Sequence, residues 1–119
     1  MRAFLNFLRE QIRHVSEIEI SAQNRLHDAG DEAAYRDGMR AKAELLAHLA
    51  TNAAPHLNDL PPEAKSRIEH RLNTFAQSAR QSLDIGSVFY MSALLYPDDH
   101  QPGQPNTLER WLTELENKP

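Results

Sequence analysis

Histidines and carboxylates are the residues of this chain whose types and spacing point most directly to chemistry. The sequence has six histidines and 17 aspartates and glutamates. Residues three or four apart share one face of a helix, so such a set could bind a single cation. Two sets have this spacing and together define a candidate metal or small-ligand site: Glu10, His14 and Glu17 in one segment, and Glu44 and His48 in another.

The order of these residues nevertheless departs from the established metal motifs. A di-iron helical bundle uses Glu-x-x-His pairs on two of its helices, and this sequence contains no such pair. It also lacks the His-x-x-x-His and His-Glu-x-x-His patterns of zinc sites. Helical periodicity places His48 opposite the apolar stripe of its own segment. Ion pairs on the helix surface are therefore the favoured interpretation, and we expect no metal and no other cofactor.

Nucleophilic and nucleotide chemistry have still less support in the sequence. The chain has no cysteine, which excludes a thiolate nucleophile, a disulfide and Cys-ligated metals. None of its serines lies in a Gly-x-Ser-x-Gly elbow, and its four glycines are too scattered to form a phosphate-binding loop. The absence of these signatures favours a protein without enzymatic activity.

Length and composition indicate one globular domain over residues 1–119, with a net charge of −4. This acidity, without any run of lysines or arginines, argues against nucleic-acid binding. The longest apolar stretch, Leu83 to Tyr96, is too short to cross a membrane. Glutamates also dilute the basic face that a membrane-surface helix would need near the N-terminus. We expect a cytoplasmic protein that binds neither membrane nor nucleic acid.

Two long helices are predicted in the first half of the chain by apolar residues that recur with a period of 3.6. The first extends from about Arg2 to Ala29, where Gly30 is suited to the left-handed position after a helix end. Asp31 is suited to cap the second helix, which is expected from about Glu32 to Ala53. Because the connection is so short, the two helices should be antiparallel neighbours.

A third long helix is predicted from near Pro62 to near Leu95. Asn106 resembles an N-cap for a short fourth helix that buries Trp111. The expected fold is therefore all-α, an antiparallel bundle of three long helices and a short C-terminal one. A continuous third helix of about 34 residues would be about 50 Å long, whereas a compact domain of this size is only about 35 Å across. The helix should therefore bend at Gly86, or the bundle should be elongated.

One acidic residue, Glu19, falls within the apolar face of the first predicted helix. It is a candidate to line an internal ligand site. Burial of an unpaired carboxylate costs too much free energy, however. The favoured interpretation is that Glu19 reaches solvent at the edge of the bundle.

The second half of the third predicted helix is apolar on nearly every side, and a helix of that kind is normally surrounded. One explanation is that the C-terminal helix folds back over it, and the other is that a partner protein covers it. A row of residues away from the core stripe, with two neighbouring aromatic residues, forms the candidate interface: Asp84, Val88, Met91, Leu95, Phe89 and Trp111.

These observations predict a non-catalytic protein-interaction module, such as an adaptor, a small chaperone or a regulatory subunit. The apolar row further predicts self-association, with a homodimer as the commonest outcome. The alternative is a helical bundle that binds a metal or a small ligand through the carboxylates and histidines named above.

Overall fold

A computed structural model describes residues 1–117 and confirms the all-α fold. Six α-helices and one short 3₁₀ helix occur among these residues, and no strand does. None of the helices in this part of the chain combines the length and apolar character needed to cross a membrane. The helices are α1 (Arg2–Ala29), α2 (Glu32–Ala47), α3 (Leu49–Ala53), η1 (Ala54–His56), α4 (Pro62–Ile85), α5 (Val88–Ala93) and α6 (Thr107–Asn117).

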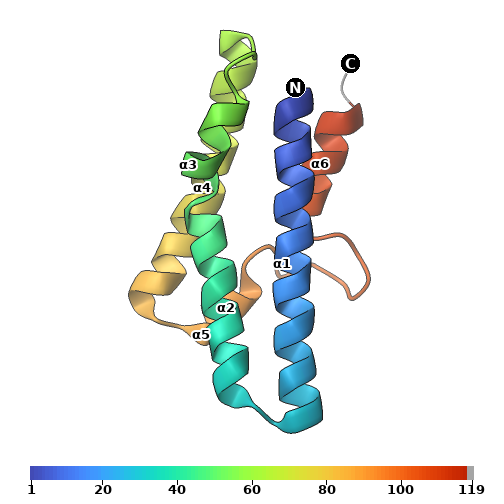
Figure 1. Cartoon of the computed structure of the whole chain (residues 1–119), viewed down its shortest axis with the longest axis vertical. Helices are drawn as coiled ribbons and strands as arrows, with labels where there is room; N and C mark the ends of the chain where they lie inside the picture. Colours follow the sequence, from blue (N-terminus) through green and yellow to red (C-terminus); the bar gives the residue numbers. More distant parts are fainter. Residues whose placement is uncertain (118–119) are drawn as a thin grey trace.

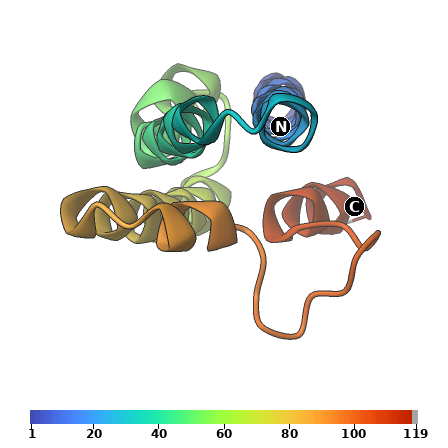
Figure 2. The same cartoon turned by 90° about the horizontal axis from the view of Figure 1, so that it is seen from below.

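The helices form two layers (Figures 1 and 2). Helices α1 and α2 lie side by side as an antiparallel hairpin in one layer. The second layer holds α4 and α5 under α2, and α6 under α1. Helices α4 and α6 are neighbours in this layer without packing closely against one another. The molecule is elongated, with extents of 48 × 29 × 25 Å.

The α1–α2 hairpin has the turn that the sequence predicts. Gly30 has a left-handed backbone with φ 62°, and its N–H donates to the carbonyl of Leu26. The carboxylate of Asp31 caps α2 by accepting a 3.0 Å hydrogen bond from the backbone N–H of Ala34. A Cβ atom on Gly38 would lie only 2.7 Å from the Cβ of Ala22, so this glycine permits the close approach of the two helices.

The second predicted helix is interrupted, which corrects the expectation of one helix to Ala53. Helix α2 ends at Ala47, and His48 leaves helical geometry with φ −97° and ψ 4°. The imidazole Nδ1 of His48 lies 2.8 Å from the carbonyl oxygen of Glu44, which also accepts the backbone N–H of His48. This helix carbonyl is thus shared between ring and backbone at the point where α2 stops. The short helices α3 and η1 then carry the chain toward the break before Pro62.

The third predicted helix bends at Gly86, so that α4 ends at Ile85 and not near Leu95. Gly86 has φ 71°, and its N–H donates to the carbonyls of Ser82 and Leu83. The hydroxyl of Ser87 then caps α5 by accepting from the N–H of Tyr90 at 3.1 Å. The two sequence alternatives both hold, because the helix bends and the molecule is still elongated.

Helix α6 begins at the predicted capping box. The side chain of Asn106 accepts from the N–H of Glu109, and the carboxylate of Glu109 accepts from the N–H of Asn106, both at 2.9 Å. This cap fixes the helix that buries Trp111, whose ring lies 5.5 Å from that of Phe4 and 5.7 Å from that of Phe75. The C-terminal helix is thereby fastened to the main core, as the sequence predicts.

Candidate functional sites

The ammonium group of Lys42 lies in the interior of the molecule. Its side chain is 0% exposed, although lysine is almost never fully buried without a partner. The Nζ atom lies 3.0 Å from Oε2 of Glu19 and donates a 3.0 Å hydrogen bond to the carbonyl of Ser92. It also lies 4.9 Å from the centre of the Tyr96 ring, and the Tyr96 hydroxyl donates to Oε1 of Glu19 at 2.8 Å. We call Lys42, Glu19 and Tyr96 the Lys42 cluster.

Burial and the ion pair act in opposite directions on the charges of this cluster. Burial lowers the pKa of Lys42, and the neighbouring carboxylate of Glu19 opposes that shift. Burial raises the pKa of the Tyr96 phenol, and its hydrogen bond to Glu19 raises that pKa further. A nucleophilic lysine would need an accessible, unprotonated amine. Here the amine is enclosed by the Glu19 carboxylate, the Ser92 carbonyl and the Tyr96 ring. The cluster therefore has a structural role, because it joins α1, α2 and the segment after α5.

The expectation that Glu19 reaches solvent was wrong, because its side chain is 14% exposed and paired with Lys42. Two sequence signals point to this pair. Lys42 lies in the apolar stripe of its helix, as Glu19 does in the preceding one. The two residues are also equally far from the Gly30–Asp31 turn, so an antiparallel hairpin brings them level. No sequence pattern indicates that Tyr96 belongs to this cluster, since that residue lies in the loop beyond α5.

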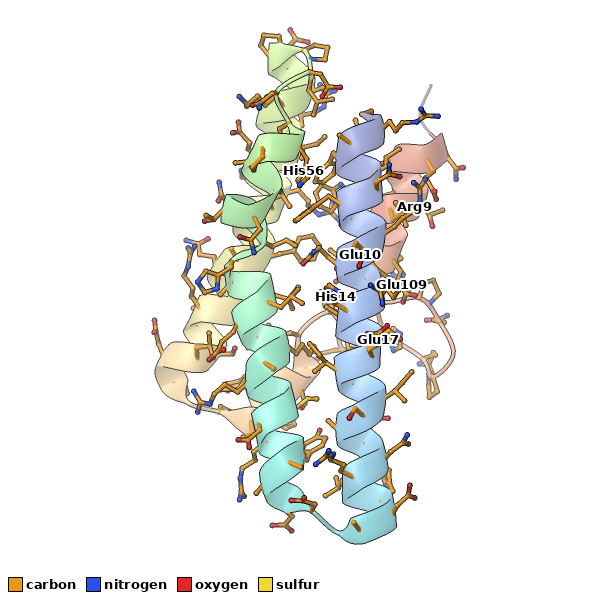
Figure 3. The ribbon with its side chains drawn as sticks, in the orientation of Figure 1. Arg9, Glu10, His14, Glu17, His56 and Glu109 are labelled. Carbon is orange, nitrogen blue, oxygen red and sulfur yellow. The ribbon has the colours of Figure 1, made fainter. Side chains whose placement is uncertain are left out.

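The candidate metal ligands of α1, namely Glu10, His14 and Glu17, lie along the same helix (Figure 3), and Arg13 pairs with both glutamates. Arg13 donates to Glu10 and, at 2.5 Å, to Oε1 of Glu17, while the ring of His14 lies 3.3 Å from Glu10. The hydrogen bond from Arg13 lowers the pKa of Glu10. The guanidinium thus occupies the position between the two carboxylates that a cation would need.

The ligand candidates on α2 do not join those on α1. Glu44 and His48 are both exposed, and the ring of His48 is directed to a carbonyl of its own helix. Within residues 1–117, no three histidine, aspartate or glutamate side chains come together in a way that could hold a metal ion. The residues on α1 and those on α2 therefore do not come together as one site.

The residues of the predicted interface row do not form one exposed surface. Met91, Leu95 and Trp111 are buried at 0%, 8% and 4% exposure. Val88 is half-buried, and only Asp84 and Phe89 are exposed.

The bend at Gly86 turns α5 toward the hairpin, which gives Met91 a cover that the sequence did not predict. Neither a partner nor the Trp111 helix covers Met91, which packs in a small cluster with residues of α1 and α2. Leu95 belongs to the main core that also contains Trp111. Met91 is buried against Ala22, Met39 and Ala43.

A different apolar surface lies at the corner between α4 and α5. Ile85, Phe89 and Tyr90 are 65%, 74% and 53% exposed, and the rings of the two aromatic residues meet edge to face at 5.7 Å. We call these three residues the corner patch. Beside them lies a hollow of about 340 Å³, whose lining includes Ile85, Tyr90 and Leu94.

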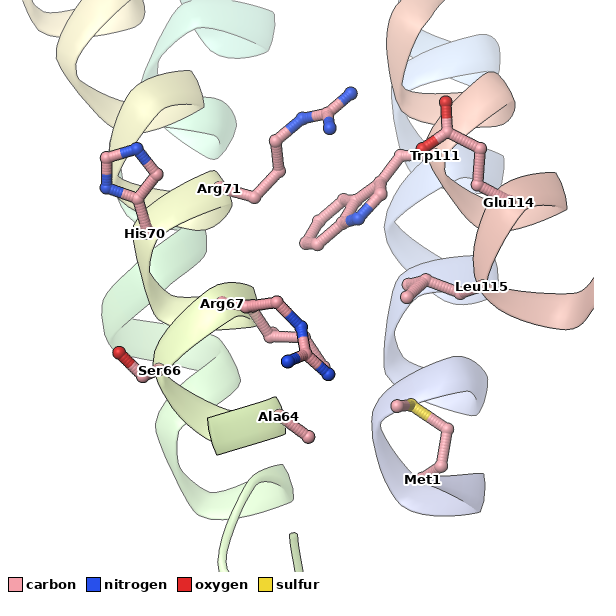
Figure 4. Close-up of a pocket in the computed structure, with 10 residues that line it drawn as sticks. Met1, Ala64, Ser66, Arg67, His70, Arg71, Trp111, Glu114 and Leu115 are labelled. Atoms are coloured by element: carbon pink, nitrogen blue, oxygen red, sulfur yellow. The ribbon is translucent and has the colours of Figure 1, made fainter. Parts of the chain in front are cut away.

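A second hollow lies between α4 and α6 and has a volume of about 710 Å³ (Figure 4). Arg67 and Arg71 extend from α4 toward Trp111 on α6. The guanidinium of Arg71 lies 5.6 Å from the Trp111 ring and 5.8 Å from that of Phe75. We call this hollow the α4–α6 groove. Its lining consists of Met1, Ala64, Ser66, Arg67, Ile68, His70, Arg71, Trp111, Glu114 and Leu115.

The two arginines of this groove form no ion pair within the described part of the chain. No carboxylate of residues 1–117 lies within 4 Å of the guanidinium nitrogens of Arg67 or Arg71. The groove therefore presents two arginines on its α4 side and one glutamate, Glu114, on its α6 side, on a protein whose net charge is −4.

Comparison with known proteins found no family model, no curated protein and no solved structure that matches this chain. Function is accordingly inferred from the geometry described above.

Proposed function

We propose that this protein is a non-catalytic protein-interaction module that self-associates, with the corner patch as its contact surface. The observation that carries the proposal is the exposure of three adjacent large apolar side chains, Ile85, Phe89 and Tyr90. Isolated apolar residues are normal on a protein surface. Clustered ones are typical of interaction sites, and aromatic residues are enriched there.

The shape of the corner supports pairing with a second copy of the chain. Phe89 projects with 74% of its surface exposed, and the neighbouring hollow of about 340 Å³ is bordered by Ile85 and Tyr90. In a dimer with two-fold symmetry, the same surface of each copy contacts the other. Phe89 of each copy would then enter the hollow of its partner.

The mass in solution tests this proposal directly. We expect the wild type to be a dimer and Phe89→Glu to be a monomer by light scattering, because two carboxylates cannot be buried unpaired at one interface. Phe89 makes little contact within its own chain, so circular dichroism of the variant should remain that of the wild type. Ile20→Glu is the matched control, since Ile20 is 57% exposed on α1 outside the patch, and this variant should remain a dimer.

A monomeric wild type at about 100 µM would contradict self-association, since a dimer with a micromolar Kd is largely assembled at that concentration. Equal masses for the wild type and Phe89→Glu would reject the corner patch as the contact surface.

A further inference from the structure

We propose that the α4–α6 groove binds an acidic amphipathic helix of a partner protein. The groove combines an apolar floor with two arginines on one rim, and these charges have no carboxylate partner within the described part of the chain. The inference rests on the proposed function only in that both concern protein interaction. The groove and the corner patch are separate surfaces.

The dimensions of the groove suit a helix. It follows α4 from Ala64 to Arg71 and is succeeded by a second hollow of about 260 Å³ that is lined by Arg71, Phe75 and Ser78. The distance along α4 from Ala64 to Ser78 is about 21 Å, which corresponds to about four helical turns. An amphipathic helix places apolar anchors at this spacing when it binds a groove between two helices.

Apolar side chains form the floor of this groove. Trp111 is 4% exposed, and Ile68 and Leu115 border the same hollow. Helices α4 and α6 approach one another so loosely that their side chains, and not their backbones, close this side of the bundle. Since Trp111 and Ile68 are 4% and 3% exposed, a further helix placed over both would chiefly cover the half-buried Ala64 and Leu115 and the two arginine side chains.

The charges specify what the partner must carry. Arg67 and Arg71 are four residues apart and therefore project from the same side of α4. Each guanidinium can bind a carboxylate through two parallel hydrogen bonds. Water is partly excluded from Arg71, because it lies half-buried over the rings of Trp111 and Phe75. Two carboxylates one turn apart on the partner helix would each form an ion pair with one of these two arginines.

The opposite rim narrows the choice of partner. Glu114 of α6 borders the same hollow, so the partner should be neutral or basic on that side. Two arginines, one glutamate and a net charge of −4 do not suit a polyanion such as nucleic acid. The groove therefore favours a helix with carboxylates confined to one side of its apolar face.

Trp111 is the only tryptophan of the chain and lines this groove, so its fluorescence serves as the probe of binding there. The probes are two synthetic helical peptides of about 16 residues with the same leucine face. One carries two glutamates one turn apart beside that face, and the other carries two lysines in their place. We expect the glutamate peptide to shift the Trp111 emission saturably and to bind at least about tenfold more tightly than the lysine peptide.

Charge reversal provides the matched comparison. The double variant Arg67→Glu/Arg71→Glu should prefer the lysine peptide. The control is Arg36→Glu/Arg40→Glu, which makes the same charge change at the same spacing on the exposed surface of α2. This control should keep the preference of the wild type for the glutamate peptide.

Equal affinity of the wild-type protein for the two peptides would overturn the proposal, as would an unchanged Trp111 emission with the glutamate peptide at about 1 mM. Dodecanoate that binds where the glutamate peptide does not would overturn it as well, by assigning the groove to a small anionic amphiphile. The comparison of the two peptides on the wild type remains decisive if circular dichroism shows that the charge-reversal variant is unfolded. Light scattering of Phe89→Glu distinguishes a failure of self-association from a failure of the groove.

Discussion

Two regions of this molecule hold a cation against an aromatic ring, and they differ in whether a carboxylate of the chain pairs with that cation. Inside the hairpin, Nζ of Lys42 lies 4.9 Å from the Tyr96 ring and 3.0 Å from a carboxylate oxygen of Glu19. In the groove, Arg71 lies 5.6 Å from the Trp111 ring, and no carboxylate of residues 1–117 lies within 4 Å of its nitrogens.

The difference follows from access to water. Lys42 is fully buried, and a buried charge without a partner costs several kcal/mol, about 3–5 when one partner of a pair is removed. The chain itself must therefore supply Glu19. Arg71 is half-buried at the side of a groove, where water can satisfy its donors. A cation that water can satisfy is free to exchange that water for the carboxylate of a partner.

The largest expected effect comes from breaking the buried pair. Glu19→Leu should lower the free energy of unfolding by about 3–5 kcal/mol, because it leaves the ammonium of Lys42 buried without a counter-charge. Adding Lys42→Met should recover most of this loss, since an apolar pair can replace a buried ion pair at little cost. Urea denaturation followed by circular dichroism measures both variants. A double variant no more stable than Glu19→Leu would show that the uncompensated charge is not the cause.

A smaller effect is expected from the titration of Tyr96. Its pKa is raised in the folded protein, whereas an exposed tyrosine ionises near pH 10. A raised folded-state pKa gives a stabilisation that is complete below about pH 10 and is lost as the pH rises further. The free energy of unfolding should therefore fall more between about pH 9 and pH 11 in the wild type than in Tyr96→Phe.

Absorbance titration near the phenolate band provides an independent check on Tyr96. One phenol of the wild type should ionise only as the protein unfolds. The absorbance change from this late ionisation should be missing from Tyr96→Phe. Titration curves that differ only by one phenol ionising near pH 10 would contradict the assignment.

The smallest effect is expected from giving the groove a carboxylate of its own. Ala64→Glu places a glutamate three residues before Arg67 and in the first turn of α4. The ion pair and the helix dipole should together add a few tenths of a kcal/mol to the free energy of unfolding. The glutamate peptide should then bind more weakly than to the wild type, while Ala64→Gln should bind it unchanged. Equal affinities for both variants would argue that Arg67 does not recognise carboxylates.

Most helix ends of this protein follow from its local sequence. The left-handed Gly30, the cap at Asp31 and the reciprocal bonds of Asn106 and Glu109 lie where the sequence predicts them. These features depend on hydrogen bonds between residues at most six positions apart. Their energies are therefore decided almost entirely by the local sequence. The end of α2 at His48 is the main exception among the helix boundaries.

The tertiary structure alone decided which residues became candidate sites. Gly86 was a predicted bend, but only the packing of α5 against the hairpin buries Met91 and leaves Phe89 exposed. Because α4 and α6 do not pack closely, Arg71 lies beside the Trp111 ring and has no carboxylate of residues 1–117 as an ion-pair partner. Helical periodicity fixes the face on which a residue lies. Whether that face is covered, and whether a charge on it is paired, depends on distances between elements far apart in the chain, which are set by the packing of the whole core.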